Sequence, residues 1–541
     1  MDQLALFFAL MLAAIVMVPL GDRLGLPTPV LMTLLGMAMA LLPFVPNVAI
    51  NPDLILPLVL PPLLYAAVQR TSWRQFAANK RPIFLLAVAL VFITMAAVAA
   101  VARSVVPGIT LAAAVALGAL VAPPDPVAAT AVAGKLGLPR RLISILEGEG
   151  LFNDVTAIVL YNVAIAAVVT GSFSWPKALG ELVLSAVVAV AVGVVLGWAA
   201  GKLMGLVDDP TLQIGLTLLV PFASYAIADT AHGSGVLAVL TTALFLAEHV
   251  ADADDVTGRL AGGTFWEVVD TLVTGVAFGL IGLELHKVLG VGSGRWGTMV
   301  AHAGLVVAVV IGVRLLWLLP AAYLAKRMHR RRDLDEDIPM SWRETAVMWW
   351  AGMRGVASIA LALAIPLRTD AGSAFPARDE VLFIAFSVVL STLVLQGLTL
   401  PWIVKRLGVS SDIEAEHDLE RMLALRAMMA AKHRLKEIEQ VEELPEELAE
   451  QLQRRAVDVG VRICPDILSE ERRETHKKRV GRIKTVQRIQ GEMLSAARHE
   501  VLSARSEPGY DPEIVDRVLR QLDLRSLRGT APRSGSTNTH P

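Results

Sequence analysis

Long apolar runs recur through the first three quarters of this 541-residue chain, and they constrain its fold more than any other feature. Runs of roughly 17 to 25 apolar residues are long enough to cross a ~30 Å hydrocarbon core as helices. Only 18% of the residues are charged and 55% are hydrophobic, whereas a soluble globular protein carries about 25% charged residues. The pattern predicts an all-α polytopic membrane protein.

The apolar runs predict about 13 transmembrane helices. Their approximate limits are 4–20, 27–44, 54–69, 83–102, 110–134, 142–170, 178–204, 211–229, 233–249, 265–285, 297–325, 343–367 and 380–402. Loops after odd-numbered spans hold most of the Lys and Arg residues, so the positive-inside rule places the C-terminus in the cytoplasm and the N-terminus outside. The start, Met1–Gln3, lacks the basic region of a signal peptide, and we expect the first span to be retained.

Two of the predicted spans are interrupted near their middle. In the fifth, the segment Pro123–Pro126 places three prolines around Asp125; in the twelfth, the segment Gly352–Gly355 has a glycine at each end and encloses Arg354. Irregular backbone persists at membrane depth only where it faces protein or a water-filled cavity, and paired interruptions are typical of a transporter's central site. We therefore expect spans 1–6 and 8–13 to form inverted repeats with two discontinuous, crossing helices.

The sixth span carries ionisable residues inside an otherwise apolar helix: Glu149 and, one turn later, Asn153 and Asp154. A carboxylate at this depth costs roughly 2.5 to 3.5 kcal/mol, so it needs a partner, a proton or a function. Burial favours the protonated form of a carboxylate and a bound cation favours the charged form. Asp154 is therefore a candidate carrier that holds either a proton or a cation, with a purely structural role as the alternative.

Other charges in the spans suggest supporting roles. Asp125 is a candidate second oxygen ligand of the cation, or a helix-capping aspartate at its proline break. Arg354 keeps its proton in proteins, so we expect it to pair with Glu149 and to neutralise carbonyl ends of the interrupted helices. Arg314 in the eleventh span is expected to be another bracing charge, and Glu147 a surface residue.

Residues 409–541 differ from the rest of the chain, because acidic and basic residues alternate there with helical spacing. We expect a helical cytoplasmic tail with a disordered end from residue 528; it is either a solvated appendage or a regulatory or dimer-forming module. The single cysteine, Cys464, excludes an internal disulfide, and no histidines have metal-ligand spacing. No cofactor and no nucleic-acid partner are expected.

Several motifs, taken together and in order, resemble the sodium/proton exchangers of the monovalent cation:proton antiporter-1 (CPA1) family. They are Leu60–Tyr65, Asp125–Ala128, Gly148–Asp154, Phe265–Glu267, Gly352–Leu363 and Gln396–Pro401. The resemblance covers residues 1–408 and implies a homodimer in which a core domain of spans 4–6 and 11–13 moves like an elevator.

The resemblance also implies residue roles. Asp154 would carry the ion and the proton, and Asp125 would be an auxiliary ligand of Na⁺ or K⁺. Glu149 with Arg354 would be a bracing pair, and Asn153 would steady the broken fifth span and contribute to cation binding. Asn153 stands where electrogenic relatives have a second aspartate, which implies electroneutral exchange.

The chain departs from the family pattern at positions where relatives have oxygen-bearing side chains. The residues here are Pro124, Gly150, Ala66 and Thr274. These departures make potassium a competitor to sodium. The sequence thus predicts a plasma-membrane antiporter that exchanges Na⁺ or K⁺ for H⁺ and contributes to pH and salt homeostasis; a passive ion channel and an ion sensor are the alternatives.

Overall fold

The computed structural model describes most of the chain. The described residues are 3–42, 52–70, 79–125, 127, 129–130, 137–172, 175–207, 209–249, 256–284, 296–332, 341–409, 413–442, 445–464, 489, 492–503, 514, 517–519 and 521. The chain separates into two compact units, Met1–Ser411 and Asp412–Pro541.

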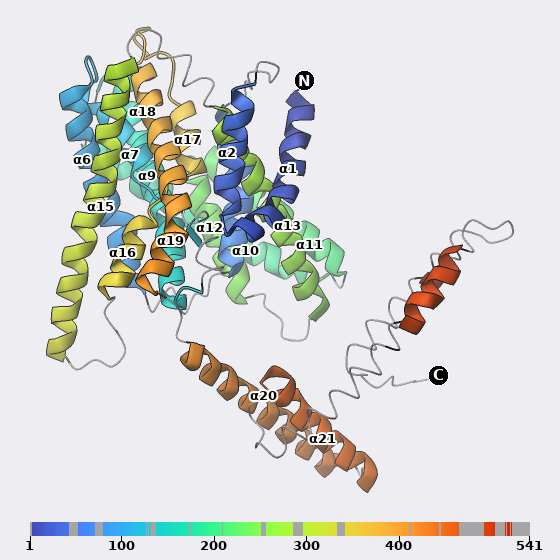
Figure 1. The fold of residues 1–541 in the computed structure, drawn as a ribbon. Helices are drawn as coiled ribbons and strands as arrows, with labels where there is room; N and C mark the ends of the chain where they lie inside the picture. The colour runs from blue at the N-terminus through green and yellow to red at the C-terminus, as the bar shows by residue number, and fades with distance from the viewer. Residues whose placement is uncertain are drawn as a thin grey trace. The chain divides into compact units, whose positions relative to one another are not determined.

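The first unit is built from helices (Figure 1). In chain order they are α1 (Gln3–Leu24), α2 (Thr28–Ala40), α3 (Pro52–Arg70), α5 (Lys80–Phe84), the π-helix η1 (Leu85–Ala89), α6 (Leu90–Val105), α7 (Leu111–Val121), α9 (Arg140–Thr170), α10 (Trp175–Met204), α11 (Pro210–Thr230), α12 (Gly235–His249), α13 (Val256–Leu283), α15 (Trp296–Arg332), α16 (Trp342–Trp350), α17 (Val356–Leu363), α18 (Arg378–Ser391), the π-helix η2 (Thr392–Gln396) and α19 (Gly397–Leu407).

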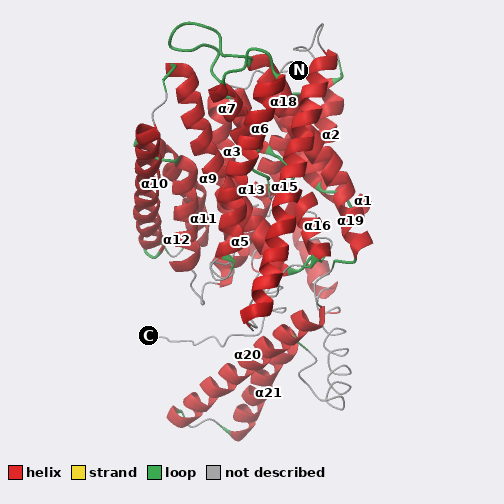
Figure 2. Ribbon diagram, turned by 90° about the vertical axis from the view of Figure 1, so that its left-hand side faces the viewer, coloured by secondary structure: helices red, strands yellow, loops and turns green. Residues whose placement is uncertain are grey.

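Many of these helices suit a membrane. Among the described residues, 8 helices are long and apolar enough to cross it, and four shorter apolar helices accompany them: Thr28–Ala40, Pro57–Gln69, Leu111–Val121 and Gly235–Glu248. Most loops lie at the two ends of the bundle (Figure 2). The prediction of an all-α polytopic membrane protein is confirmed, while the count of 13 spans stays a prediction.

The helices of the first unit pack as two groups (Figure 1). The core group comprises α5, η1, α6, α7, α9 and α15 to α19, and the scaffold group comprises α1 to α3 and α10 to α13. The groups meet where α17 packs against α3 and α13, where α9 packs against α12, and where η2 packs against α2. The contact between the groups therefore involves the interrupted twelfth span and the helix that carries Asp154.

The second unit contains two helices that pack side by side, α20 (Ile413–Val441) and α21 (Glu446–Ile463). Pro445 lies immediately before α21, as its fixed φ angle favours. The buried side chains of this pair are small or aliphatic: Ala424, Leu435, Ala456, Val461 and Cys464. The expected disordered end from residue 528 lies outside the described residues.

A candidate cation site at two crossed helix breaks

The first break follows α7, which ends at Val121. Helix cannot continue smoothly through Pro123–Pro126, because proline has no N–H to donate and clashes with the preceding turn. Asp125 is therefore in irregular backbone, and its N–H donates to the carbonyl oxygen of Met353 at 2.6 Å. That bond joins the first break directly to the second.

The second break separates α16 from α17. A capping box starts α16, in which Ser341 and Glu344 exchange side-chain to backbone hydrogen bonds. The helix ends at Trp350, residues 351–355 are not helical, and α17 starts at Val356. Interruptions predicted in the fifth and twelfth spans are thus present, and they contact each other.

Arg354 fills the space between the two breaks. Its side chain is 2% exposed, and its guanidinium donates to the carbonyl oxygens of Val121 (3.0 Å) and Ala122 (3.2 Å) and to that of Gly352. The last carbonyls of a helix have no partner within it and carry partial negative charge. Arg354 therefore neutralises the open end of α7, as predicted.

Glu149 has a different partner from the one predicted. Its two carboxylate oxygens accept from Nη1 and Nη2 of Arg314 at 2.5 and 2.8 Å, and both side chains are buried. Arg314 also donates from Nε to the carbonyl of Met348 at 3.1 Å. The predicted Glu149–Arg354 ion pair is wrong, because the guanidinium of Arg354 instead donates to carbonyl oxygens at the helix ends. Arg314 on α15 forms a bidentate pair with the Glu149 carboxylate, with two parallel hydrogen bonds.

Asp125 accepts two backbone hydrogen bonds. Oδ1 accepts from the N–H of Val127 at 2.8 Å, and Oδ2 accepts from that of Val356, the first residue of α17, at 3.4 Å. A Cβ on Gly355 would lie 1.5 Å from Oδ2 of Asp125, so only glycine allows this approach. The capping role is therefore real, and each carboxylate oxygen keeps a further lone pair for a ligand.

Asn153 links the sixth span to the first break. Its side chain is fully buried, and Nδ2 donates to the carbonyl oxygen of Pro124 at 2.7 Å. Its Oδ1 has no hydrogen-bond partner in the described structure. Asn153 thus holds the broken segment against α9 and presents one unsatisfied buried oxygen.

Asp154 lies on α9, half-buried, and makes no hydrogen bond or ion pair with the part of the chain that the structure describes. It lines a cavity of about 50 Å³ together with Asp125. The other lining residues come from α3, α9, α17 and the two breaks and are mostly apolar: Leu60, Leu63, Leu64, Ala67, Pro123, Val127, Gly150, Leu151, Gly355, Val356, Ala357 and Ser358. The cavity therefore lies between the scaffold and core groups and holds only a few water-sized molecules.

Ser358 is a cavity residue that the sequence reasoning missed. It lies in the first turn of α17 and is 2% exposed. Its hydroxyl makes no hydrogen bond with any residue that the structure describes, although buried hydroxyls normally have a partner. In the sequence Ser358 is one serine in an apolar run, and only the contact of α17 with the cavity distinguishes it.

The donor set suits a monovalent cation. Carboxylate and hydroxyl oxygens from Asp154, Asp125 and Ser358 face one small cavity, and hard cations are bound by such oxygens. A cation here is a substrate and not a resident cofactor. An all-helical membrane protein with a carboxylate cavity at two crossed helix breaks is, as a class, a secondary transporter.

Comparison with known proteins gives the family. Residues 9–406 match the family model described as sodium/hydrogen exchanger, transmembrane. The chain belongs to the sodium/hydrogen exchanger family, whose members are cation/proton antiporters and not enzymes.

Two relatives and one solved structure are informative. An uncharacterised Na⁺/H⁺ exchanger of Mycobacterium tuberculosis is 29% identical over 97% of this chain and 96% of its own length, so the similarity extends through the tail. A sodium, potassium, lithium and rubidium/H⁺ antiporter of Bacillus pumilus is 28% identical over 74% of this chain and 61% of its own. The sodium proton antiporter MjNhaP1 of Methanocaldococcus jannaschii shares the fold, with a TM-score of 0.57 and 18% identity over 75% of this chain and 98% of that one.

Proposed function

We propose that this protein is an electroneutral antiporter that exchanges one Na⁺ or K⁺ for one H⁺ across the plasma membrane by alternating access, and so contributes to pH and salt homeostasis. One observation carries the proposal. Of the charged groups around the two breaks, Glu149, Arg314, Arg354 and Asp125 all have polar partners, and Asp154 has none among the described residues.

The chemistry proposed for Asp154 follows from that difference. A buried carboxylate with no fixed partner, facing a cavity with room for an ion, is stabilised by binding either a proton or a cation, and it cannot bind both well. Asp125 and Ser358 would supply further oxygen ligands when the cation is bound. Asn153 is neutral and Asp125 already accepts two backbone hydrogen bonds, so Asp154 alone would exchange one proton for one cation.

Access to the cavity would alternate by movement of the core group against the scaffold group. The support for this proposal is that α3 lines the cavity from the scaffold group, whereas α9 and α17 line it from the core group. A small shift between the groups therefore changes which side of the cavity is closed. We further propose that the scaffold group makes the contact in a homodimer, as the family resemblance implies.

The proposed choice of cation rests on the ligand set. Pro124, Gly150 and Ala66 supply no side-chain oxygen, so the site has fewer oxygens than the family pattern provides. Fewer fixed ligands discriminate less between ions of different size, because discrimination requires a rigid cage. Together with the name of the Bacillus pumilus relative, a sodium, potassium, lithium and rubidium/H⁺ antiporter, this supports transport of potassium as well as sodium.

The proposal is tested in acid-loaded proteoliposomes that contain the full-length protein. We expect the lumen to become alkaline on addition of NaCl or KCl and not of choline chloride, at a rate that an imposed membrane potential leaves unchanged. A rate that follows the potential would contradict electroneutrality. No alkalinisation with any cation, in protein that remains folded, would contradict the function itself.

A further inference from the structure

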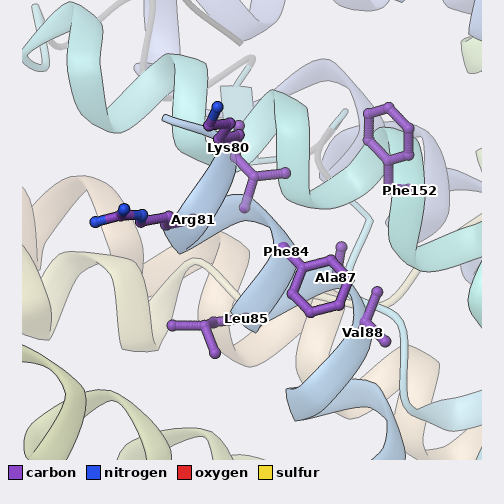
Figure 3. Close-up of a pocket in the computed structure, with 8 residues that line it drawn as sticks. Lys80, Arg81, Phe84, Leu85, Ala87, Val88 and Phe152 are labelled. Carbon is purple, nitrogen blue, oxygen red and sulfur yellow. The ribbon is translucent and has the colours of Figure 1, made fainter. Parts of the chain in front are cut away.

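A second hollow lies at the start of the fourth span (Figure 3) and shares no lining residue with the carboxylate cavity. It has a volume of about 620 Å³, within the range of small-molecule sites. Its lining residues are Lys80, Arg81, Ile83, Phe84, Leu85, Ala87, Val88 and Phe152. We call this hollow the α5–α9 groove, because α5 and η1 form one wall and Phe152 of α9 contributes to the other (Figure 3).

The groove is cationic at one end and apolar along the rest of its length. Lys80 and Arg81 are the first two residues of α5 and are exposed, and neither makes an ion pair or hydrogen bond with the residues described. The remaining lining side chains are all apolar, and Phe84 is 62% exposed. A ligand that fits must therefore carry negative charge at one end and hydrocarbon at the other.

The position of the groove along a membrane helix favours a lipid among ligands of this kind. Lys80 is also the first residue of a helix long enough to cross a membrane, Lys80–Val105, so we expect its ammonium group at headgroup depth. Val88 is eight residues further along, about 12 Å deeper at 1.5 Å per residue. We propose that the α5–α9 groove binds an anionic phospholipid, with its phosphate on Lys80 and Arg81 and an acyl chain against Phe84, Val88 and Phe152.

The orientation predicted for the chain agrees with this ligand. The loop that holds Lys80 and Arg81 follows the third span, which the positive-inside rule assigns to the cytoplasmic side. Anionic lipids contribute a negative surface potential at that leaflet, and each nearby Lys or Arg strengthens attraction to it. A zwitterionic lipid would fill the same groove, but its net-neutral headgroup would be attracted less strongly to Lys80 and Arg81.

The groove also touches the helix that carries the proposed ion site. Phe152 precedes Asp154 by two residues on α9. At Gly148, a Cβ would lie 2.4 Å from Cδ1 of Ile83, so α5 packs directly on α9 there. The groove wall includes the π-helix η1, a local irregularity that is frequent at functional sites. A lipid in the groove would therefore contact the carrier helix, and we expect its occupancy to influence exchange.

Binding is tested on the delipidated full-length protein in detergent by native mass spectrometry, with phosphatidylglycerol and phosphatidylcholine as probes. The variant Lys80→Gln/Arg81→Gln removes both cations and keeps the apolar wall. The matched control Lys405→Gln/Arg406→Gln removes two exposed cations from the end of another membrane helix, α19. We expect the first variant to bind phosphatidylglycerol about thirtyfold more weakly than wild type, and the control to bind it as wild type does.

A third variant, Val88→Trp, fills the apolar end and keeps both cations. We expect it to weaken phosphatidylglycerol binding as well, and we expect glycerol phosphate without acyl chains not to compete. Equal affinity for the two lipids, unchanged binding in the Lys80/Arg81 variant, or unchanged binding in Val88→Trp would each overturn the proposal. These measurements use no ion gradient, so their outcome is independent of whether the protein exchanges cations.

Discussion

The break in the fifth span and the break in the twelfth differ in composition and in charge. The first contains prolines around a carboxylate, Asp125, and the second contains glycines around a guanidinium, Arg354. Each break supplies the charged group that the other requires: Arg354 binds the carbonyl end of α7, and Asp125 accepts an N–H at the start of α17. Helix ends carry partial charges of opposite sign, so both contacts are favourable.

The comparison shows why the two breaks act as one structural unit. Proline interrupts α7 by removing donors, whereas glycine allows Asp125 to approach the backbone at Gly355. Each break depends on the other for part of the hydrogen bonding at its helix ends. Asp154 is outside this reciprocal arrangement and has no polar partner among the described residues, so we assign it the carrier role, whereas Asp125 combines helix capping with the role of auxiliary ligand.

The largest expected effect on stability comes from the buried pair that supports both breaks. Glu149→Gln leaves the guanidinium of Arg314 buried without a charged partner, and we expect a loss of about 3 to 5 kcal/mol in the free energy of unfolding. Denaturant or thermal unfolding of the purified protein in detergent measures it.

A double-mutant cycle sharpens the same comparison. Adding Arg314→Gln to Glu149→Gln should lower the free energy of unfolding little further, because the pair is already broken. Adding Arg354→Gln to Glu149→Gln should lower it by nearly as much as Arg354→Gln does alone. Strong coupling of Glu149 to Arg354 instead of Arg314 would contradict the observed pairing.

The next effect concerns the close approach of the two breaks. Gly355→Ala would place a Cβ against Asp125, whose carboxylate must then move out of the cavity, and we expect the exchange rate to fall by roughly 10- to 100-fold. Gly312→Ala on α15 is the control, because a Cβ there meets nothing within 4 Å. Exchange assays in proteoliposomes compare the two, and equal rates would show that the approach of Asp125 to Gly355 is dispensable.

The smallest effect is expected at Ser358. Ser358→Ala removes one proposed oxygen ligand and should raise the KM for the cation by about tenfold with a small change in maximal rate. Ser144→Ala is a matched control. Ser144, on α9, is also buried and its hydroxyl has no partner in the described structure, but it does not line the cavity. The same KM in both variants would remove Ser358 from the ligand set.

Much of the fold was predictable because its signals are local. Apolar runs define membrane helices, and proline or glycine clusters define breaks, without knowledge of neighbours in space. The partner of Glu149 was not predictable in this way: Arg314 is 165 residues distant in the chain, and both Arg314 and Arg354 are buried cations of the same type. Which one meets the carboxylate depends on how α9 packs against α15 and α16.

The candidate site was predictable to a similar extent. Asp125 and Asp154 stood out because a carboxylate in an apolar span is costly, and the structure places both at one cavity. Ser358 could not be singled out, since a hydroxyl in a membrane helix usually bonds its own backbone and costs little. Cation preference, electroneutrality and the dimer remain predictions.

The most direct test of the central claim is cation-driven proton movement in proteoliposomes that contain Asp154→Asn. The amide has a similar shape but cannot alternate between a proton and a cation, so we expect a normally folded protein with no exchange for Na⁺ or K⁺. Exchange that persists at a rate comparable to wild type would contradict the assignment of Asp154 as the carrier.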